Sequence, residues 1–288
     1  MLNAHLKRLH LQSPQPETLA KFYARAYGMQ RQSGTGAAHC GAAGRETSMS
    51  TGGATRLHYA WFCFDDAHSW SAFEKRCAAL PKAALDQFPE LPPDAIGALD
   101  PEGNCMVFSL EPAAQPEANA AVAGTDAAMA ESDTALPAAV LQHFALRTQH
   151  IDAMRAFYVD ALGFVLSDNV LDGDGALKAC FLRVSALHHS LALFGAPVAC
   201  FDHQSFETPN WDALKQWADH MSAQRIEIVW GVGRHGPGND VFFMVRDPDG
   251  NLAEISSEIE TCEPNRPVGI WRHEERTLNL WGKAIMRG

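Results

Sequence analysis

The chain has 288 residues, of which 47% are hydrophobic and 20% charged, so it is long enough for two ordinary globular domains. Its net charge of −11 argues against general binding to nucleic acids or anionic membranes, because both need extended basic surfaces. The chain lacks an apolar run of about 18 residues, and residues 1–13 lack a signal-peptide pattern, so we expect a cytoplasmic protein without membrane contact.

The predicted elements follow the same order in the two halves of the chain. Residues 6–11 are strand-like, and helical spacing of apolar residues covers 17–29. Residues 141–148 and 152–164 repeat this strand and helix at a constant offset of 135. Later in each half a further strand-like segment, 59–64 or 201–207, comes before a hairpin turn. The two turns are DPEGN at 100–104 and DPDGN at 247–251.

Self-similarity on this scale indicates a duplicated module. We expect an α+β fold of tandem modules, each built from paired βαβββ units that curl a mixed sheet around a concave face. An Ala- and Pro-rich linker without large apolar side chains is predicted at 112–139. It separates an N-terminal module without metal at 1–111 from a catalytic, metal-binding module at 140–260. The tail at 261–288 should pack on the modules or across a dimer contact, with an active-site lid as the alternative.

The second half contains a set of potential metal ligands. Its cysteines form no C-x-x-C pair, so histidines and carboxylates are the candidates. His143, His203 and Glu254 each lie on a strand-like segment. In all three segments, side-chain alternation places the candidate opposite a bulky apolar residue suited to packing under a helix. Two histidines and a carboxylate on one concave face can hold a divalent metal and leave coordination positions open.

The first half lacks this set. When the two halves are aligned, His143 corresponds to Arg8, His203 to Tyr59 and Glu254 to Val107. The first half has therefore lost, or never had, all three ligands. We therefore expect the metal only in the C-terminal module, inside a funnel lined by strands.

This arrangement resembles the vicinal oxygen chelate superfamily, and within it the two-domain type I extradiol ring-cleavage dioxygenases. The resemblance implies that His143, His203 and Glu254 hold Fe(II), with Mn(II) as the other possible metal. It also implies that His189 acts as acid and base, and that His235, in a glycine-rich loop, contacts the substrate oxygens. The substrates would then be a catechol-like aromatic diol and O2, and ring opening would occur beside the diol.

One position departs from the pattern of that family. A tyrosine usually lies nine residues after the loop histidine, but here that position is Met244. Methionine cannot donate a hydrogen bond to the substrate. We place Met244 in the substrate pocket, together with Asn239 and His188.

Two other functions stay open at this stage. A non-oxygenase isomerase or lyase of the same superfamily would chelate substrate oxygens without using O2, and Met244 favours this alternative. A binding protein of the bleomycin-resistance type would not need the metal ligands. For each function we expect a homo-oligomer, because exposed sheet edges and the aromatic tail favour association.

Overall fold

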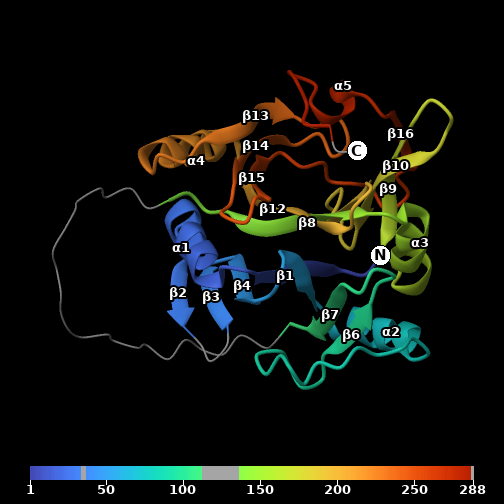
Figure 1. Ribbon diagram of the computed structural model, residues 1–288. Coiled ribbons are helices and arrows are strands. Elements are labelled where there is room, and N and C mark those ends of the chain that lie inside the picture. Colours follow the sequence, from blue (N-terminus) through green and yellow to red (C-terminus); the bar gives the residue numbers. More distant parts are fainter. Residues whose placement is uncertain (34–36, 112–135, 287–288) are drawn as a thin grey trace.

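The computed structural model describes residues 1–33, 37–111 and 136–286, which form two β-sheets and their covering helices (Figure 1). Most of the predicted linker, residues 112–135, lies outside the described residues. The seven-stranded sheet and its helices form the N-terminal module. Its elements are β1 (Ala4–Ser13), α1 (Pro16–Tyr27), β2 (Gln30–Ser33), β3 (Ala37–Ala42), β4 (Arg45–Thr51), β5 (Arg56–Phe64), α2 (Ala67–Cys77), β6 (Ile96–Leu99) and β7 (Cys105–Leu110).

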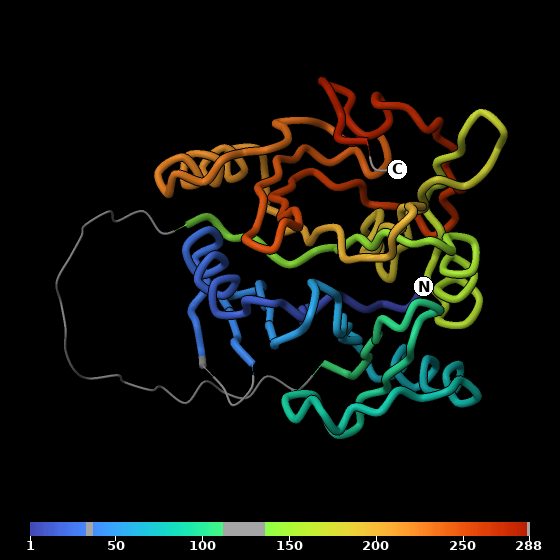
Figure 2. Tube along the Cα trace, viewed as in Figure 1, coloured from blue at the N-terminus to red at the C-terminus, as the bar shows by residue number. Residues whose placement is uncertain are grey.

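The nine-stranded sheet forms the C-terminal module, drawn from green to red in Figure 2. Its first βαβββ unit comprises β8 (Val140–Thr148), α3 (Ile151–Ala156) with the π-helical turn η1 (Phe157–Ala161), β9 (Val165–Leu171), β10 (Leu177–Arg183) and β11 (Leu191–Gly195). The second comprises β12 (Cys200–Thr208), α4 (Trp211–Ala223), β13 (Ile228–Arg234), β14 (Val241–Arg246) and β15 (Leu252–Ser257). The tail contributes β16 (Gly269–Arg272), which pairs with β9, and the short helix α5 (Glu275–Leu278).

The predicted α+β fold is confirmed, and the strand order shows how each module is built. In the C-terminal module β8 pairs in parallel with β11, β12 pairs in parallel with β15, and the two units join through antiparallel β8 and β12. The N-terminal module repeats this scheme with β1 and β4, β5 and β7, and the antiparallel junction of β1 and β5. Each junction lies near the middle of its sheet.

The N-terminal module departs from the predicted βαβββ pattern in its second unit. Among the described residues, only β6 and β7 follow α2, and an irregular segment at 82–95 takes the place of the missing strand. Pro92 and Pro93 offer no N–H group to a β-ladder, which disfavours a strand there. Phe88 and Leu91 of this segment pack with Tyr59 on the inner face of the sheet. This segment therefore covers the inner face around Tyr59, and a pocket lined by Arg8, Glu46 and Glu90 remains beside it.

The helix-covered faces of both sheets share one apolar core. Tyr27 of α1 packs against Phe206 and Trp217 of the C-terminal module, with ring centroids 4.8 and 6.1 Å away. A matching contact starts from the C-terminal module, where Phe164, just after η1, packs against Phe62 of the N-terminal module. No helix in the part of the chain that the structure describes is long and apolar enough to cross a membrane.

The hairpin turns also join the modules in a reciprocal way. Tyr23 of α1 donates its hydroxyl to Asp247 Oδ2 at 3.2 Å, in the turn of the other module. Tyr158 donates likewise to Asp100 Oδ2 at 2.9 Å. All four side chains are buried, so each turn of the duplicated sequence is anchored by the helix of the opposite module.

Candidate metal centre

The register of three adjacent strands brings His143, His203 and Glu254 together. His143 on β8 and Glu254 on β15 both lie opposite Ser205 of β12, and His203 precedes Ser205 by two residues on the same face. One potential ligand atom from each of the three residues lies within 4.8 Å of the other two. All three side chains are buried, at 2, 4 and 0% exposure. These are the three metal ligands expected from the sequence.

Two β-bulges hold the rings of these histidines. Gln142 is the extra residue on β8 between two paired positions, and Asp202 is the extra residue on β12. Each therefore leaves the regular alternation and lies beside the histidine that follows it. Gln142 Oε1 contacts His143 Nδ1, and Asp202 Oδ1 accepts from His203 Nδ1 at 2.6 Å. The partners are fixed in turn, because Gln142 Nε2 donates to the carbonyl of His189 at 2.5 Å and Arg147 Nε donates to Asp202 at 2.8 Å.

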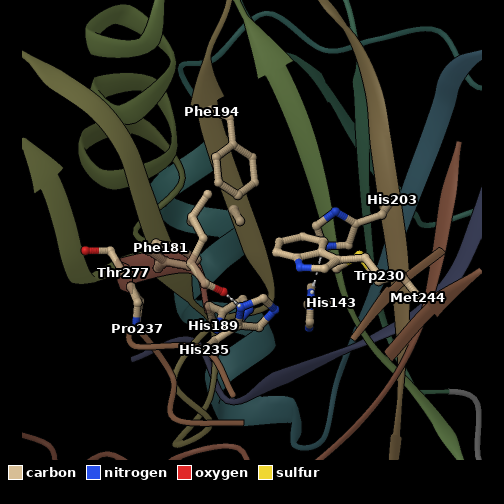
Figure 3. A pocket seen from close by; sticks show the side chains of 12 residues that line it. His143, Phe181, His189, Phe194, His203, Trp230, His235, Pro237, Met244 and Thr277 are labelled. Carbon is tan, nitrogen blue, oxygen red and sulfur yellow. Dashed lines mark hydrogen bonds between the residues drawn. The ribbon is translucent and has the colours of Figure 1, made fainter. Parts of the chain in front are cut away.

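These contacts decide which nitrogen of each imidazole carries the proton. Because Nδ1 of both rings faces an oxygen acceptor, the proton lies on Nδ1 and the lone pair on Nε2. The two Nε2 atoms lie 3.3 Å apart and point toward one another in Figure 3. Burial, followed by the neighbouring His203, His235 and His188, holds the pKa of His143 well below its usual value, so this ring is neutral. Two facing lone pairs beside a buried carboxylate fit a divalent cation as the missing partner.

The strand register confirms how the two halves align. In the N-terminal module Arg8 lies opposite Trp61, and Trp61 lies opposite Val107, in the same relation as His143, Ser205 and Glu254. Tyr59 occupies the place of His203 two residues earlier on β5. Even the bulges recur, at Lys7 and His58. The bulged frame is therefore a property of the fold, and only the C-terminal copy carries ligands in it.

His189 in the pocket wall and His188 behind it form a buried chain. The two Nδ1 atoms are 3.0 Å apart, and His188 Nε2 lies 3.1 Å from Asp168 Oδ2. Burial raises the pKa of Asp168, but contacts with His188 and Arg266 outweigh it and give a net lowering, so the group is a carboxylate. An anion at this end favours a proton on His188 Nε2, so His188 Nδ1 accepts from His189 Nδ1. His189 then keeps the lone pair on its Nε2.

His235 approaches the centre from the glycine loop after β13. Its Nδ1 donates to the carbonyl of Leu278 at 2.6 Å, drawn as a dashed line in Figure 3, and its ring stacks on Phe242 at 3.7 Å. Its Nε2 lies 3.9 Å from Glu254 Oε2. Asp240, five residues further on, is fully buried near both groups. Burial, opposed by His235 and reinforced by Glu254, raises the pKa of Asp240 to about 7.

The pocket above the centre has mostly apolar walls. Its lining consists of His143, Phe181, His189, Ala192, Phe194, His203, Trp230, His235, Pro237, Met244, Thr277 and Leu278. Met244 therefore lies where the sequence places it. Of the other two predicted pocket residues, His188 lies behind His189, and Asn239 is exposed on the loop and does not line the cavity.

The tail takes part in the site more directly than its sequence indicates. Thr277 and Leu278 close one side of the cavity, and Trp271 donates its indole N–H to Asp168 at 2.6 Å. Trp281, in contrast, is 54% exposed beside Trp211. The tail is thus both a packing element and part of the pocket wall.

Several site residues carry no signal that sequence reasoning could use. Gln142 and Asp202 would be assigned to the opposite face by simple alternation, because a bulge cannot be read from residue type. Asp240 resembles an ordinary polar loop residue. The one feature of the sequence that could have pointed to Asp202 and Gln142 is their position, because each directly precedes a predicted ligand histidine.

Residues 140–255 match the family model described as the Glyoxalase/Bleomycin resistance protein/Dioxygenase superfamily. This C-terminal segment is therefore similar to the superfamily that is also called vicinal oxygen chelate. The matched residues contain the whole His143, His203 and Glu254 set, so the family match and the candidate metal centre fall on the same module.

Curated relatives in this superfamily are extradiol dioxygenases. Metapyrocatechase 2 of Cupriavidus necator is 29% identical over 196 residues, which cover 65% of this chain and 60% of that protein. Metapyrocatechase of Pseudomonas sp. (strain CF600) is 34% identical over 116 residues, or 39% of this chain and 37% of that protein. The alignments thus span between about a third and three fifths of these relatives.

Two solved structures share the fold of this protein. Homoprotocatechuate 2,3-dioxygenase from Arthrobacter globiformis aligns over 98% of this chain and 88% of that chain, with a TM-score of 0.75 and 21% identity. The Mn(II)-bound glyoxalase from Novosphingobium aromaticivorans aligns over 96% and 90%, with a TM-score of 0.73 and 22% identity. One fold therefore accommodates proteins with both names.

Proposed function

We propose that this chain is an Fe(II)-dependent extradiol dioxygenase that opens the ring of a catechol-like aromatic diol with O2. The observation that carries the proposal is the pair of facing Nε2 lone pairs of His143 and His203 beside buried Glu254. The extradiol dioxygenases among the relatives support the reaction class. Fe(II) held by these residues would supply adjacent open positions for both diol oxygens and O2, and Mn(II) would suit the same ligands.

The other residues of the pocket have roles that follow from their contacts. His189 accepts a proton from a diol hydroxyl through Nε2, because its Nδ1 is held by His188. Burial holds the pKa of His189 well below its usual value, so the ring is neutral before the diol arrives. His235 orients a substrate oxygen while Leu278 holds its Nδ1. The apolar side chains of Phe181, Trp230 and their neighbours exclude water from the ring.

In the overall reaction one ring C–C bond beside the diol breaks. Both atoms of O2 enter the product, which carries a carboxylic acid and a carbonyl group. The substrate supplies the electrons, so no external reductant is needed.

Met244 favours a second candidate, a metal-dependent isomerase or lyase that chelates substrate oxygens without consuming O2. The thioether in the pocket wall offers no phenolic proton, and the polar side chains of the lining are the histidines, Thr277 and Trp230, whose indole N–H donates to the carbonyl of Lys283. The Thr277 hydroxyl already donates to the carbonyl of Arg272 at 2.5 Å.

Oxygen uptake separates the two candidates. The chain is loaded anaerobically with Fe(II) and offered a panel of catechols, with His143→Ala as the test variant. His150→Ala is the matched control, because His150 is an exposed histidine outside the pocket. Uptake that is abolished only in His143→Ala supports the dioxygenase. Stoichiometric metal binding without uptake for any diol supports the isomerase or lyase.

A further inference from the structure

Asp240 is a buried carboxylate that the proposed function does not use. Its side chain has no exposure to solvent, and neither of its oxygens has a hydrogen-bond partner among the described residues. Burying an ionised carboxylate without a partner is strongly unfavourable, so groups of this kind are normally paired or coordinate a metal. The position of Asp240 therefore indicates a partner that binds from outside the chain.

The surroundings of Asp240 indicate what that partner is. One oxygen of Asp240, one oxygen of Glu254 and a ring nitrogen of His235 lie within 4.8 Å of one another. Leu278 accepts from His235 Nδ1, so Nε2 carries the lone pair, and it lies 3.9 Å from Glu254 Oε2. Donor atoms bound at about 2.1 Å to one octahedral ion lie roughly 3 to 4 Å apart, and the 3.9 Å between His235 Nε2 and Glu254 Oε2 lies within that range.

We propose that His235, Asp240 and Glu254 form a second divalent-cation position that shares Glu254 with the His143 and His203 position. Asp240 does not belong to the first ligand group, so it supplies a carboxylate that the first position does not have. One imidazole and two carboxylates suit Mn(II), Fe(II) or Zn(II) better than softer ions. The position goes beyond the proposed function, which requires only the first ion.

The loop is built to hold these ligands in place. His235 is fixed by stacking on Phe242 with an angle of 6° between the rings, in addition to its bond to Leu278. Gly238 has φ of +84°, and a Cβ there would lie 2.9 Å from Asp240 Oδ1. The close backbone approach leaves Asp240 no room to turn toward this side of the loop. The ligand atoms are thus preorganised before any ion binds.

A cation at this position would have a consequence for catalysis. His235 cannot coordinate an ion and orient a substrate oxygen through the same Nε2 lone pair. Occupancy of the second position would therefore inhibit turnover at high concentrations of the divalent metal. In Asp240→Asn the inhibition should disappear, because the amide is a far weaker ligand.

Binding of Mn(II) alone to the metal-free full chain tests the proposal. We expect two equivalents by elemental analysis after dialysis against micromolar Mn(II), and an exchange-coupled electron paramagnetic resonance spectrum, because Glu254 bridges the ions. Asp240→Asn should retain one equivalent with an uncoupled spectrum. His143→Ala should also retain one. Asp212→Asn, an exposed aspartate on α4, is the matched control and should retain two.

The outcomes separate this proposal from the proposed function. One equivalent in both the wild-type chain and Asp240→Asn overturns the second position and leaves the first intact. No stoichiometric binding in the wild-type chain overturns both. If Asp240→Asn fails to fold by circular dichroism, His235→Gln is measured in its place, with the same expectation of one equivalent.

Discussion

Asp247, in the DPDGN turn of the C-terminal module, should make the stability of the chain depend on pH. Burial, partly offset by Asn251, raises the pKa of this carboxyl from 3.8 to about 6. The folded chain thus holds the proton more tightly than the unfolded chain. Its stability is unaffected by this group below pH 3.8, falls as the pH rises from 3.8 to about 6, and stays lower above that.

The size of the effect follows from the shift. One pKa unit corresponds to about 1.4 kcal/mol, so ionised Asp247 lowers the free energy of unfolding by about 3 kcal/mol at neutral pH. Asp247→Asn removes this penalty and keeps an oxygen that accepts from the backbone N–H groups of Asp249 and Asn251. The stability of the variant relative to wild type should therefore increase by about 2 kcal/mol between pH 4.5 and 7.5.

Urea unfolding at a series of pH values measures this difference. Asp249→Asn is the matched control, since it removes the same charge from the same turn at a less buried position. We expect the curve of unfolding free energy against pH to change shape only for Asp247→Asn. Parallel curves for Asp247→Asn and wild type would refute the reasoning, because the carboxyl would then titrate alike in the folded and unfolded chains.

Three further predictions concern other contacts. Gly238→Ala should destabilise the chain by about 1–3 kcal/mol in thermal melts, because its φ is +84° and a Cβ would meet three side-chain atoms within 3.2 Å. Gly250→Ala is the control and should destabilise the chain less, because its φ is +91° but a Cβ there would have no neighbour within 4 Å. Asp202→Asn should weaken Mn(II) binding about 10- to 100-fold in calorimetric titrations, and unchanged affinity would contradict its role in orienting the ligand ring. Tyr158→Phe should lower the unfolding free energy by about 1.5–3 kcal/mol, since it removes the hydroxyl donated to buried Asp100, and a loss below 0.5 kcal/mol would argue against that anchor.

Side-chain alternation and the internal repeat were sufficient to predict which residues share a strand face and how the two modules correspond. Strand alternation placed His143, His203 and Glu254 on one face, and the repeat predicted Arg8 at the position of His143 in the other module. Both expectations agree with the strand register. The alternation and the repeat predict these positions because the strand register is strongly constrained. A one-residue shift in register would turn every apolar side chain of a strand away from the core.

Features that break a period could not be predicted in this way. Gln142 and Asp202 depend on bulges that no residue type specifies, and the segment 82–95 replaces a strand expected from the repeat. Asp240 and Asn239 are neighbours in one loop, yet one is fully buried and the other exposed. Their difference follows from the tertiary packing of the loop against His188 and the tail, which a single sequence does not encode locally.

The most direct test of the central claim is isotope incorporation from ¹⁸O2 by the Fe(II)-loaded chain, with a catechol taken from the uptake panel. Mass spectrometry of the ring-opened product should find two ¹⁸O atoms in each molecule, and no product with His143→Ala. A converted substrate without ¹⁸O would contradict the dioxygenase and support metal-dependent isomerisation or lysis. A chain that binds no metal would contradict the metal centre itself.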